Sequence, residues 1–315
     1  MMEGPQHVVV LGGTGFVGRH LIPRLSSDGH RVTVIGRRRD DARHLILLPT
    51  VQVVEGDALD AATLARHTQD ATVVVNLIGI LNERGRDTFE RVHVDAARTV
   101  VEACTRNGVA RLLHMSAINA DPAGPSRYLR SKGEAEAIVA AASLAWTIFR
   151  PSVMFGRGDA FLNLFARLQK ALPVVALAAP DARFAPVFVG DVAHAFASSL
   201  RGDATLRQRY ELCGPDVYTL EALVRYVGKL TGHPRPVVRL SPALSKLQAR
   251  VLEMLPGTLM SRDNLASMQR DAVCSGPFPP VFALEPAKLE ATAPAWLAPQ
   301  SVHSRYDPLR AQRRS

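Results

Sequence analysis

The segment Val8-Val9-Val10-Leu11-Gly12-Gly13-Thr14-Gly15-Phe16-Val17-Gly18 decides the fold. A run of apolar, mostly β-branched residues ends at closely spaced glycines, and apolar residues at helical spacing follow. This pattern predicts a buried strand that leads through a tight turn into a helix. Glycine permits the turn, lets a pyrophosphate approach the backbone, and lets the helix pack closely on the strand. We therefore predict dinucleotide binding at the start of this helix, with contacts from Gly12, Thr14, Gly15, Phe16, Val17 and Gly18.

Strand and helix patterns alternate through the first half of the chain, which predicts an α/β fold with a doubly wound parallel sheet. We expect strands at 7–11, 31–35, 51–54, 72–78, 110–115 and 145–149, and helices at 16–27, 60–67, 88–107 and 126–142. Further helices are expected at 161–172 and 219–231, and a short strand at 187–189 precedes a helix that Asp191 caps. These elements divide the chain into a dinucleotide-binding domain, residues 1–200, and a smaller C-terminal substrate or partner lobe, residues 201–315.

Composition excludes several classes of protein. The net charge is +9, but the basic residues are spread along the chain rather than gathered in the dense stripe typical of a nucleic-acid binder. Apolar runs fall short of the roughly 20 residues that a membrane span needs, and the first residues do not resemble a signal peptide. Cys104, Cys213 and Cys274 are few and widely spaced, which predicts a reducing, cytoplasmic compartment and no disulfide. The histidines form no ligand pair, so we expect no metal site.

The end of the second predicted strand indicates which dinucleotide binds. In an NAD-specific fold a carboxylate stands there and bonds the ribose 2′-hydroxyl. Here the strand ends at Gly36 and is followed by Arg37, Arg38 and Arg39. A cationic cluster suits a 2′-phosphate, so we predict NADP(H), with contacts from Arg37 and Arg38, in preference to NAD(H). The alternative is a solvated loop whose arginines pair with neighbouring aspartates.

Tyr128 and Lys132 are four residues apart on a predicted helix and therefore share a face. A nearby ammonium favours the phenolate, so we expect the pKa of Tyr128 to fall below its usual value. Such a tyrosine can exchange a proton with a substrate oxygen while hydride moves between substrate and nicotinamide. Ser116, directly after a predicted strand, would orient that oxygen. Ser116, Tyr128 and Lys132 are thus the predicted catalytic residues.

These motifs resemble the extended or atypical branch of the short-chain dehydrogenase/reductase superfamily over about residues 7–200. The resemblance implies that Asp57 lies by the adenine, Gly79 beside the ribose, and Pro151 to Val153 near the nicotinamide. Ala58, Leu77 and Ile78 are counted with these residues as cofactor contacts. The further segments that carry the resemblance are Gly56-Asp57, Asn76-Leu77-Ile78-Gly79, Arg150-Pro151-Ser152-Val153-Met154-Phe155-Gly156 and Val187-Phe188-Val189-Gly190-Asp191-Val192-Ala193.

A closer likeness is to one subgroup, the accessory subunit of respiratory complex I with this fold (alpha-subcomplex subunit nine) and its bacterial homologues. Tyr128-Leu129-Arg130-Ser131-Lys132-Gly133-Glu134 and Asp159-Ala160-Phe161-Leu162-Asn163 resemble that subgroup's segments. The likeness implies NADPH binding and an association with respiratory or quinone metabolism, and it is consistent with a cytoplasmic protein peripheral on the inner face of the membrane. His93 and Val153 depart from the pattern of nucleotide-sugar enzymes. For His93 we favour helix packing over a catalytic role.

Three functions are consistent with these observations. The first is an NADPH-dependent oxidoreductase linked to respiratory or quinone metabolism, with an unknown small-molecule substrate. The second is a nucleotide-binding structural or redox-sensing accessory protein without turnover. The third and weakest is a nucleotide-sugar epimerase or dehydratase.

One apolar stripe carries a separate prediction. Leu244, Leu247, Val251 and Met254 fall at helical spacing, which is typical of a core-facing helix. If the stripe is exposed beside Lys246 and Arg250, it would instead be a peripheral membrane or partner face.

Overall fold

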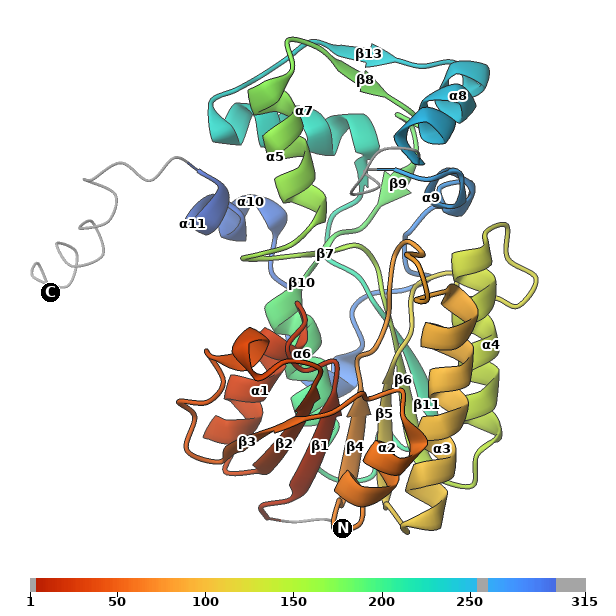
Figure 1. Cartoon of the computed structure of the whole chain (residues 1–315). Coiled ribbons are helices and arrows are strands. Elements are labelled where there is room, and N and C mark those ends of the chain that lie inside the picture. Colours follow the sequence, from red (N-terminus) through yellow and green to blue (C-terminus); the bar gives the residue numbers. More distant parts are fainter. Residues whose placement is uncertain (1–3, 254–259, 299–315) are drawn as a thin grey trace, which may run out of the picture.

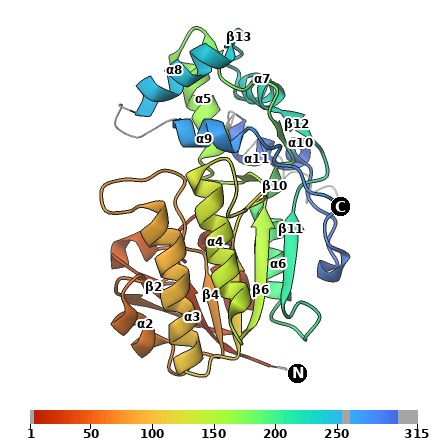
Figure 2. The same cartoon turned by 90° about the vertical axis from the view of Figure 1, so that its right-hand side faces the viewer.

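The computed structural model describes residues 4–253 and 260–298. Its centre is a seven-stranded sheet in the order β11-β6-β5-β4-β1-β2-β3, in which every neighbouring pair is parallel (Figure 1, Figure 2). This confirms the predicted doubly wound parallel sheet. The strands are β1 (His7–Leu11), β2 (Arg31–Gly36), β3 (Val51–Glu55), β4 (Val73–Asn76), β5 (Arg111–Met115), β6 (Ala145–Pro151) and β11 (Gln208–Leu212). The sheet thus takes its outer strand β11 from beyond residue 200.

Helices cover both faces of the sheet because successive strand residues point to opposite sides. In β1, Val8 and Val10 pack in one core cluster, with residues of α1 and α6, while Val9 and Leu11 pack in another, with residues of α2, α3 and α4. These helices are α1 (Gly18–Ser27), α2 (Ala61–His67), α3 (Ala96–Arg106), α4 (Arg127–Ala141) and α6 (Val189–Ser198), with a short 3₁₀ helix at Arg39–Ala42. Strands buried on both faces explain the continuous apolar runs from which they were predicted.

The order of the strands fixes where a ligand can bind. After β3 the chain returns to the other side of β1 and continues with β4, so the connections that follow β1 and β4 leave the sheet in opposite directions. In open sheets of this kind the crevice beyond the carboxyl ends of these two strands is the ligand site. The glycine turn after β1 lies at this point.

Two predicted elements differ from the observed ones for local reasons. The strand expected at 72–78 ends at Asn76, because the Asn76 side-chain oxygen accepts the N–H of Ile78 (3.1 Å) and turns the chain out of the sheet. The helix expected at 88–107 begins as a π-helical turn, Glu90–Asp95, and continues as α3. Helix α3 ends at Arg106, and two residues later Gly108 has a φ of 64°, in the left-handed region typical of the residue that follows a helix.

The predicted cap of α6 is wrong. The helix begins at Val189, immediately after β10 (Val187–Phe188), so Asp191 lies within its first turn. The Asp191 carboxylate instead accepts the N–H of Ala287 (2.8 Å), a contact across 96 residues that sequence cannot show. Thr219, in contrast, caps α7 (Leu220–Thr231), which forms where the helix at 219–231 was expected, and its hydroxyl oxygen accepts the N–H of Ala222 (3.1 Å).

A smaller upper layer stands over the carboxyl ends of the strands (Figure 1). Its core packs α5 against α7 and is closed by two short C-terminal helices. The elements of this layer and its junction with the sheet are α5 (Phe161–Ala171), α7, α8 (Pro242–Glu253), α9 (Arg262–Ser267), α10 (Leu289–Thr292), α11 (Pro294–Leu297), β7 (Met154–Phe155), β8 (Val175–Leu177), β9 (Arg183–Phe184), β10, β12 (Tyr218–Thr219) and β13 (Val237–Arg239), and a 3₁₀ turn at Pro280–Phe282 lies beside α6. No helix of the described ranges is long and apolar enough to cross a bilayer.

The expectation that the cysteines form no disulfide is wrong. Cys213, at the end of β11, is bonded to Cys274, in the segment after α9, and only Cys104 is a free, buried thiol among the described residues. The two cysteines lie together because Ala185 binds a residue near each: its N–H donates to the Ala272 carbonyl (3.0 Å), and its own carbonyl accepts the N–H of Gly214 (3.2 Å). A separation of 61 residues hides this proximity in the sequence.

The expectation that the stripe on α8 faces the core is also wrong. Leu244, Leu247 and Val251 are each more than half exposed, and the buried side chains of this helix are Ser245 and Ala249. Met254, the fourth residue of the stripe, lies outside the described residues.

Candidate cofactor and active site

The glycines after β1 serve separate purposes. Gly12 has a φ of 72°, and a Cβ there would lie 3.0 Å from the carbonyl carbon of Leu77. Gly18 packs against the backbone of Gly13 so closely that a Cβ could not fit, which allows α1 to approach the strand. A Cβ on Gly15 would meet only the Gly12 oxygen (3.1 Å) and would otherwise project into open space. Gly15 therefore leaves bare backbone at the start of α1, as a pyrophosphate contact requires.

The end of β2 lies beside this turn, since a Cβ on Gly36 would contact the Thr14 methyl group (3.4 Å). Arg37 is largely exposed, and its Nη1 lies 3.6 Å from Oδ2 of Asp87. Arg38 is also exposed. Both guanidinium groups are thus accessible after the end of β2, where the sequence predicts contacts with a 2′-phosphate.

Arg91 binds the two carboxylates next to Arg37, those of Asp57 and Asp87. Arg91, on the π-helical turn, lies 3.4 Å from Oδ1 of Asp87 and 3.7 Å from Oδ2 of Asp57. Asp57 also accepts the N–H of Leu59 (3.0 Å), and the adjacent Ala58 packs on the core cluster of α2 and α3. The predicted adenine contacts therefore lie in one band with Arg37, at the carboxyl ends of β2 and β3.

The segment after β4 connects this band to helix α4. Leu77 extends the pairing with β1, donating its N–H to Leu11 (3.0 Å), and Ile78 packs on the cluster behind it. A Cβ on Gly79 would lie 3.6 Å from both Nε2 of His93 and Nζ of Lys132. The absence of a side chain at Gly79 leaves this approach to Lys132 open.

Lys132 is a buried cation. Its ammonium donates to the carbonyl oxygen of Met115 (2.8 Å), and burial lowers the pKa of Lys132 to about 8, although Glu136 acts in the opposite direction. Met115 is the last residue of β5, so this bond ties α4 to the strand end that carries Ser116.

Ser116 carries an orphaned hydroxyl group. Its N–H donates to Phe149 (2.7 Å), but its buried Oγ finds no hydrogen-bond partner among the residues that the structure describes. A buried polar atom without a partner costs about 1–3 kcal/mol and calls for an explanation, such as a ligand atom that completes it. Ser116 is thus suited to hold a substrate oxygen.

Tyr128 lies in the first turn of α4, which Ser126 caps, and its ring packs edge-on against Phe89 and His93. The expectation of a lowered pKa is wrong: burial raises the pKa of Tyr128 to about 12. Desolvation of the buried phenolate is the cause. A phenol that stays protonated at neutral pH is suited to donate a proton.

His93 is a packing residue, as predicted. Nδ1 of His93 lies 2.8 Å from Oγ of Ser131, and the Ser131 hydroxyl donates its own proton to the Tyr128 carbonyl (2.9 Å). We therefore assign the proton between His93 and Ser131 to Nδ1 of His93, which donates it to Oγ. Nε2 then accepts the N–H of Ile80 (3.1 Å). Both ring nitrogens are thus occupied by hydrogen bonds. Burial, with the charge of Lys132, lowers the pKa of His93 to about 2, so the ring stays neutral.

The loop after β6 closes the other side of the crevice. Pro151 accepts the N–H of Ile118 (2.9 Å), two residues after Ser116, and Val153 accepts the N–H of Val187 (3.0 Å). A Cβ on Gly156 would lie 3.5 Å from the ring of Phe16, which joins this loop to the glycine turn. Val17, by contrast, is buried on the sheet side of the turn, in the cluster of α1.

Sequence analysis missed Asp263, on α9. Its carboxylate accepts the backbone N–H groups of Arg127 (2.6 Å) and Tyr128 (3.0 Å) and so holds the first turn of α4 from outside the sheet. The Ser261–Asn264 capping box marks the start of α9 in the sequence. Nothing there indicates that α9 meets a helix 135 residues earlier.

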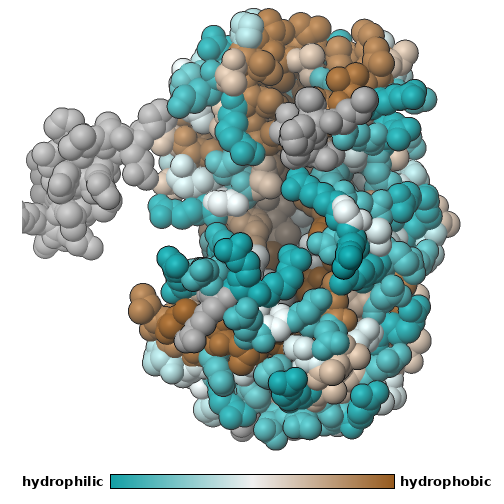
Figure 3. Space-filling view, viewed as in Figure 1, coloured by the Kyte–Doolittle hydropathy of each residue, from teal (hydrophilic) through white to brown (hydrophobic). Residues whose placement is uncertain are grey.

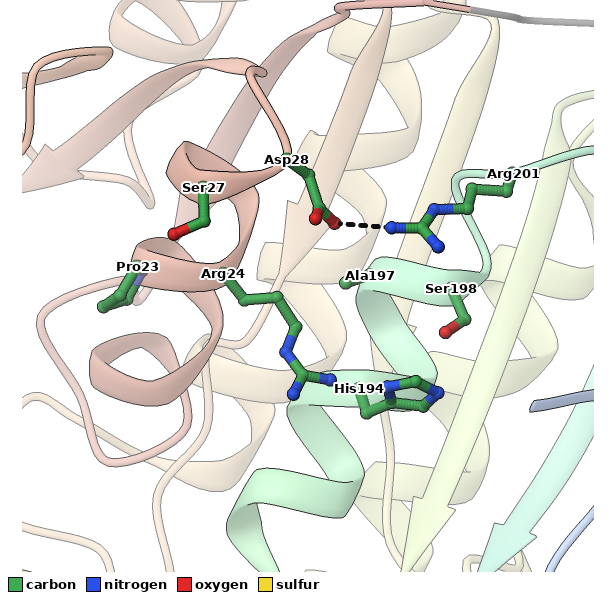
Figure 4. A pocket seen from close by; sticks show the side chains of 8 residues that line it. All are labelled: Pro23, Arg24, Ser27, Asp28, His194, Ala197, Ser198 and Arg201. Atoms are coloured by element: carbon green, nitrogen blue, oxygen red, sulfur yellow. Dashed lines mark hydrogen bonds and ion pairs between the residues drawn. The ribbon is translucent and has the colours of Figure 1, made fainter. Parts of the chain in front are cut away.

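Figure 3 shows a hollow between the sheet-bearing half and the upper layer, with apolar surface inside it. Two other cavities lie elsewhere and include no predicted site residue. One, of about 410 Å³, lies between α1 and α6, where Asp28 and Arg201 form an ion pair (3.1 Å) across it (Figure 4). The other, of about 690 Å³, lies beside the disulfide. Within the described ranges, no group of three or more His, Cys, Asp or Glu side chains could hold a metal ion.

Comparisons with known proteins agree with this geometry. Residues 12–160 match a family model described as NAD(P)H-binding. The chain is 35% identical over 229 residues to the mitochondrial NADH dehydrogenase [ubiquinone] 1 alpha subcomplex subunit 9 of Rattus norvegicus, covering 70% of this chain and 60% of that protein. It is 32% identical over 234 residues to the ceramide reductase of Caulobacter vibrioides, covering 74% of this chain and 73% of that one.

Among solved structures, the dTDP-glucose 4,6-dehydratase DesIV of Streptomyces venezuelae, with NAD and TYD bound, superposes with a TM-score of 0.72. It is 17% identical, and the match covers 92% of this chain and 95% of that one. At this identity the likeness concerns the fold alone. The match of residues 12–160 to the NAD(P)H-binding family model and the glycine turn at the switch point together indicate a dinucleotide-binding fold.

Proposed function

Because this chain belongs to the NAD(P)-binding Rossmann family of epimerase- and dehydratase-like proteins, with complex I subunit 9 and bacterial ceramide reductase among its homologues, we propose that it is an NADPH-dependent reductase of a lipophilic carbonyl compound or quinone. The orphaned hydroxyl of Ser116 carries this proposal. This hydroxyl lies at the strand end whose last carbonyl binds Lys132, and Lys132 lies one helical turn after Tyr128 on α4. A substrate oxygen bound there would give the hydroxyl the hydrogen-bond partner that it lacks. The bound cofactor would supply hydride.

Each residue then has one task. Gly12, Thr14, Gly15, Phe16, Val17 and Gly18 would cradle the pyrophosphate; Arg37 and Arg38 would hold the 2′-phosphate of NADP(H); Asp57 and Ala58 would flank the adenine; Leu77, Ile78 and Gly79 would flank the ribose; and Pro151 and Val153 would border the nicotinamide. Ser116 would donate a hydrogen bond to the substrate oxygen, and Tyr128, kept protonated by burial, would transfer a proton to it. Lys132 would orient the ribose near Gly79.

The substrate class follows from two observations. The hollow between the two halves contains apolar surface (Figure 3). The names of the rat and Caulobacter relatives refer to ubiquinone and to ceramide, and both are lipids. A lipid substrate and a respiratory relative also support a peripheral place on a membrane surface, in association with respiratory or quinone metabolism.

The test is NADPH oxidation by the purified protein with a short-chain quinone and a lipophilic ketone. Tyr128→Phe and Ser116→Ala should each lower kcat by about 10²–10⁴-fold, since each removes a group that acts on the substrate oxygen. The Kd for NADPH should change little. Tyr210→Phe, on β11, is the matched control and should retain the wild-type rate. A Tyr128→Phe variant as active as wild type would refute the assignment.

A second candidate is a nucleotide-binding accessory protein without turnover. The observation in its favour is His93, whose two ring nitrogens are both engaged and leave no proton relay behind Tyr128. In that case the wild type would bind NADPH without oxidising it. Gly15→Val, which blocks the pyrophosphate, would then abolish the rise in Tm on adding NADPH, whereas Tyr128→Phe would keep it.

A further inference from the structure

Two stretches of the upper layer carry an unusual composition. Residues 161–180 and 232–252 contain no Asp or Glu but six basic residues. These stretches form α5, β8, β13 and most of α8. The strands β8 and β13 pair with each other and α8 is bonded to β8, at the end of the molecule away from the sheet, while α5 runs from this end towards β7 (Figure 1, Figure 2). The basic residues are Arg167, Lys170, Arg235, Arg239, Lys246 and Arg250.

The same stretches expose large aliphatic side chains, namely Leu172, Val174, Val238, Leu244, Leu247 and Val251. Together with the six basic residues we call this surface the α8 face. Figure 3 shows apolar surface at this end of the molecule. Soluble monomers rarely expose large contiguous apolar patches without a function.

The orientation of α8 is fixed by its packing. Its small residues Ser245 and Ala249, four apart, are buried, and the Gln248 amide donates to the carbonyl of Ala176 (2.8 Å) on β8. Leu244 and Leu247, three apart on the helix, are therefore held outward, at 51% and 57% exposure. This is the reverse of an ordinary amphipathic surface helix.

The acidic residues next to the α8 face are paired. Asp181 and Glu221 (3.3 Å) both contact Arg239, so the charge of this one arginine is balanced, and Glu221 also pairs with Arg225 (2.7 Å). Glu253, at the end of α8, pairs with Arg262 (2.8 Å). Lys246 and Arg250, beside the outward leucines, are exposed, so the face combines aliphatic surface with net positive charge.

We propose that the α8 face docks on the surface of an anionic lipid bilayer. Aliphatic side chains flanked by Lys and Arg are typical of helices that lie in a membrane interface. A protein-binding surface would favour Trp and Tyr over Lys, and the two stretches contain no Trp and no Tyr. A second copy of this chain would bring two positive faces together. Charge complementarity therefore selects anionic headgroups.

This inference deepens the proposed function, because it names the surface from which a lipophilic substrate would arrive. Helix α8 packs against α9, and α9 supplies the Asp263 carboxylate that binds the backbone of Tyr128. The Leu81 carbonyl, on the other side of α9, accepts from Asn264 (3.3 Å). The docked face would thus lie next to the catalytic end of α4.

The test is co-sedimentation of the full chain with vesicles of phosphatidylcholine, with and without phosphatidylglycerol. Wild type should bind the anionic vesicles and release at high salt. Leu244→Gln with Leu247→Gln, and separately Lys246→Gln with Arg250→Gln, should each weaken binding about tenfold or more. Leu47→Gln with Arg66→Gln, exposed residues of the sheet-bearing half, are the matched control and should bind as wild type does.

Three results would overturn the proposal: no binding by wild type, equal loss in the control variant, or concentration-dependent dimerisation that the α8 variants abolish without vesicles. NADPH oxidation of a water-soluble short-chain quinone, measured on the same samples, separates this outcome from a failure of the proposed reductase function. The α8 variants should keep that activity, since their residues lie outside the cofactor crevice.

Discussion

The buried ammonium of Lys132 links the stability of the fold to the chemistry of the site. The cation is held by the Met115 carbonyl and kept from water, which lowers the pKa of Lys132 from 10.5 to about 8. The folded protein carries this cost at neutral pH, which is expected if the position serves binding and catalysis, as in the proposed function.

A pH dependence follows. Between about pH 8 and pH 10 the unfolded chain keeps the Lys132 proton that the folded protein has released, so the free energy of unfolding should rise with pH, by at most about 3 kcal/mol. Urea unfolding of wild type and Lys132→Met at about pH 7.5 and pH 9 measures it. Wild type should gain stability relative to Lys132→Met, and Lys246→Met should behave as wild type does. Parallel pH profiles for wild type and Lys132→Met would contradict this.

Sequence reasoning selected Ser116, Tyr128 and Lys132 as candidates because each stands at a recognisable place, a strand end or one helix face, and the structure ties Lys132 to the strand end before Ser116. It misjudged the pKa of Tyr128, since burial is a property of the packed structure. It could not find Asp263, whose bond to the Tyr128 N–H joins residues 135 apart.

At the scale of elements, buried β-branched runs predicted the first six strands of the sheet to within a few residues. Helix starts were less predictable where tertiary contacts decide them. Asp191 looks like a cap, but its carboxylate binds Ala287 instead. For α8 the prediction assigned the leucine stripe to the core, whereas the structure buries Ser245 and Ala249 instead. The periodicity shows that an apolar stripe exists, but it does not show which side of the helix the neighbouring elements cover.

The disulfide is an element-scale prediction. The bond between Cys213 and Cys274 fastens the segment after α9 to the end of β11, and closure of a loop of this length typically adds about 2–4 kcal/mol. Dithiothreitol should therefore lower the free energy of unfolding of wild type by that amount and leave Cys213→Ser unchanged. Three free thiols in protein purified without reductant, or no effect of dithiothreitol on wild type, would contradict the bond.

At the scale of the whole molecule, the sheet and its upper layer enclose one crevice at the carboxyl ends of the strands. The sequence predicted this arrangement for the sheet because alternating strands and helices permit few topologies. The composition of the upper layer was less predictable, since α5, β7, β8, β9 and β10 come from before residue 200, while β11 returns to the sheet after it. Long-range pairing of short strands leaves little trace in a sequence.

The central claim is that this crevice binds NADP(H) through the glycine turn and the arginines after β2. Calorimetric titration of the wild type with NADPH and with NADH tests it most directly. A charge-assisted bond from Arg37 or Arg38 to the 2′-phosphate is worth about 1.5–3 kcal/mol, so Kd should be about tenfold to a hundredfold lower for NADPH. Arg37→Ala with Arg38→Ala should remove most of this difference, and Arg66→Ala should preserve it. Equal or reversed affinities in the wild type, or binding of neither dinucleotide, would contradict the account.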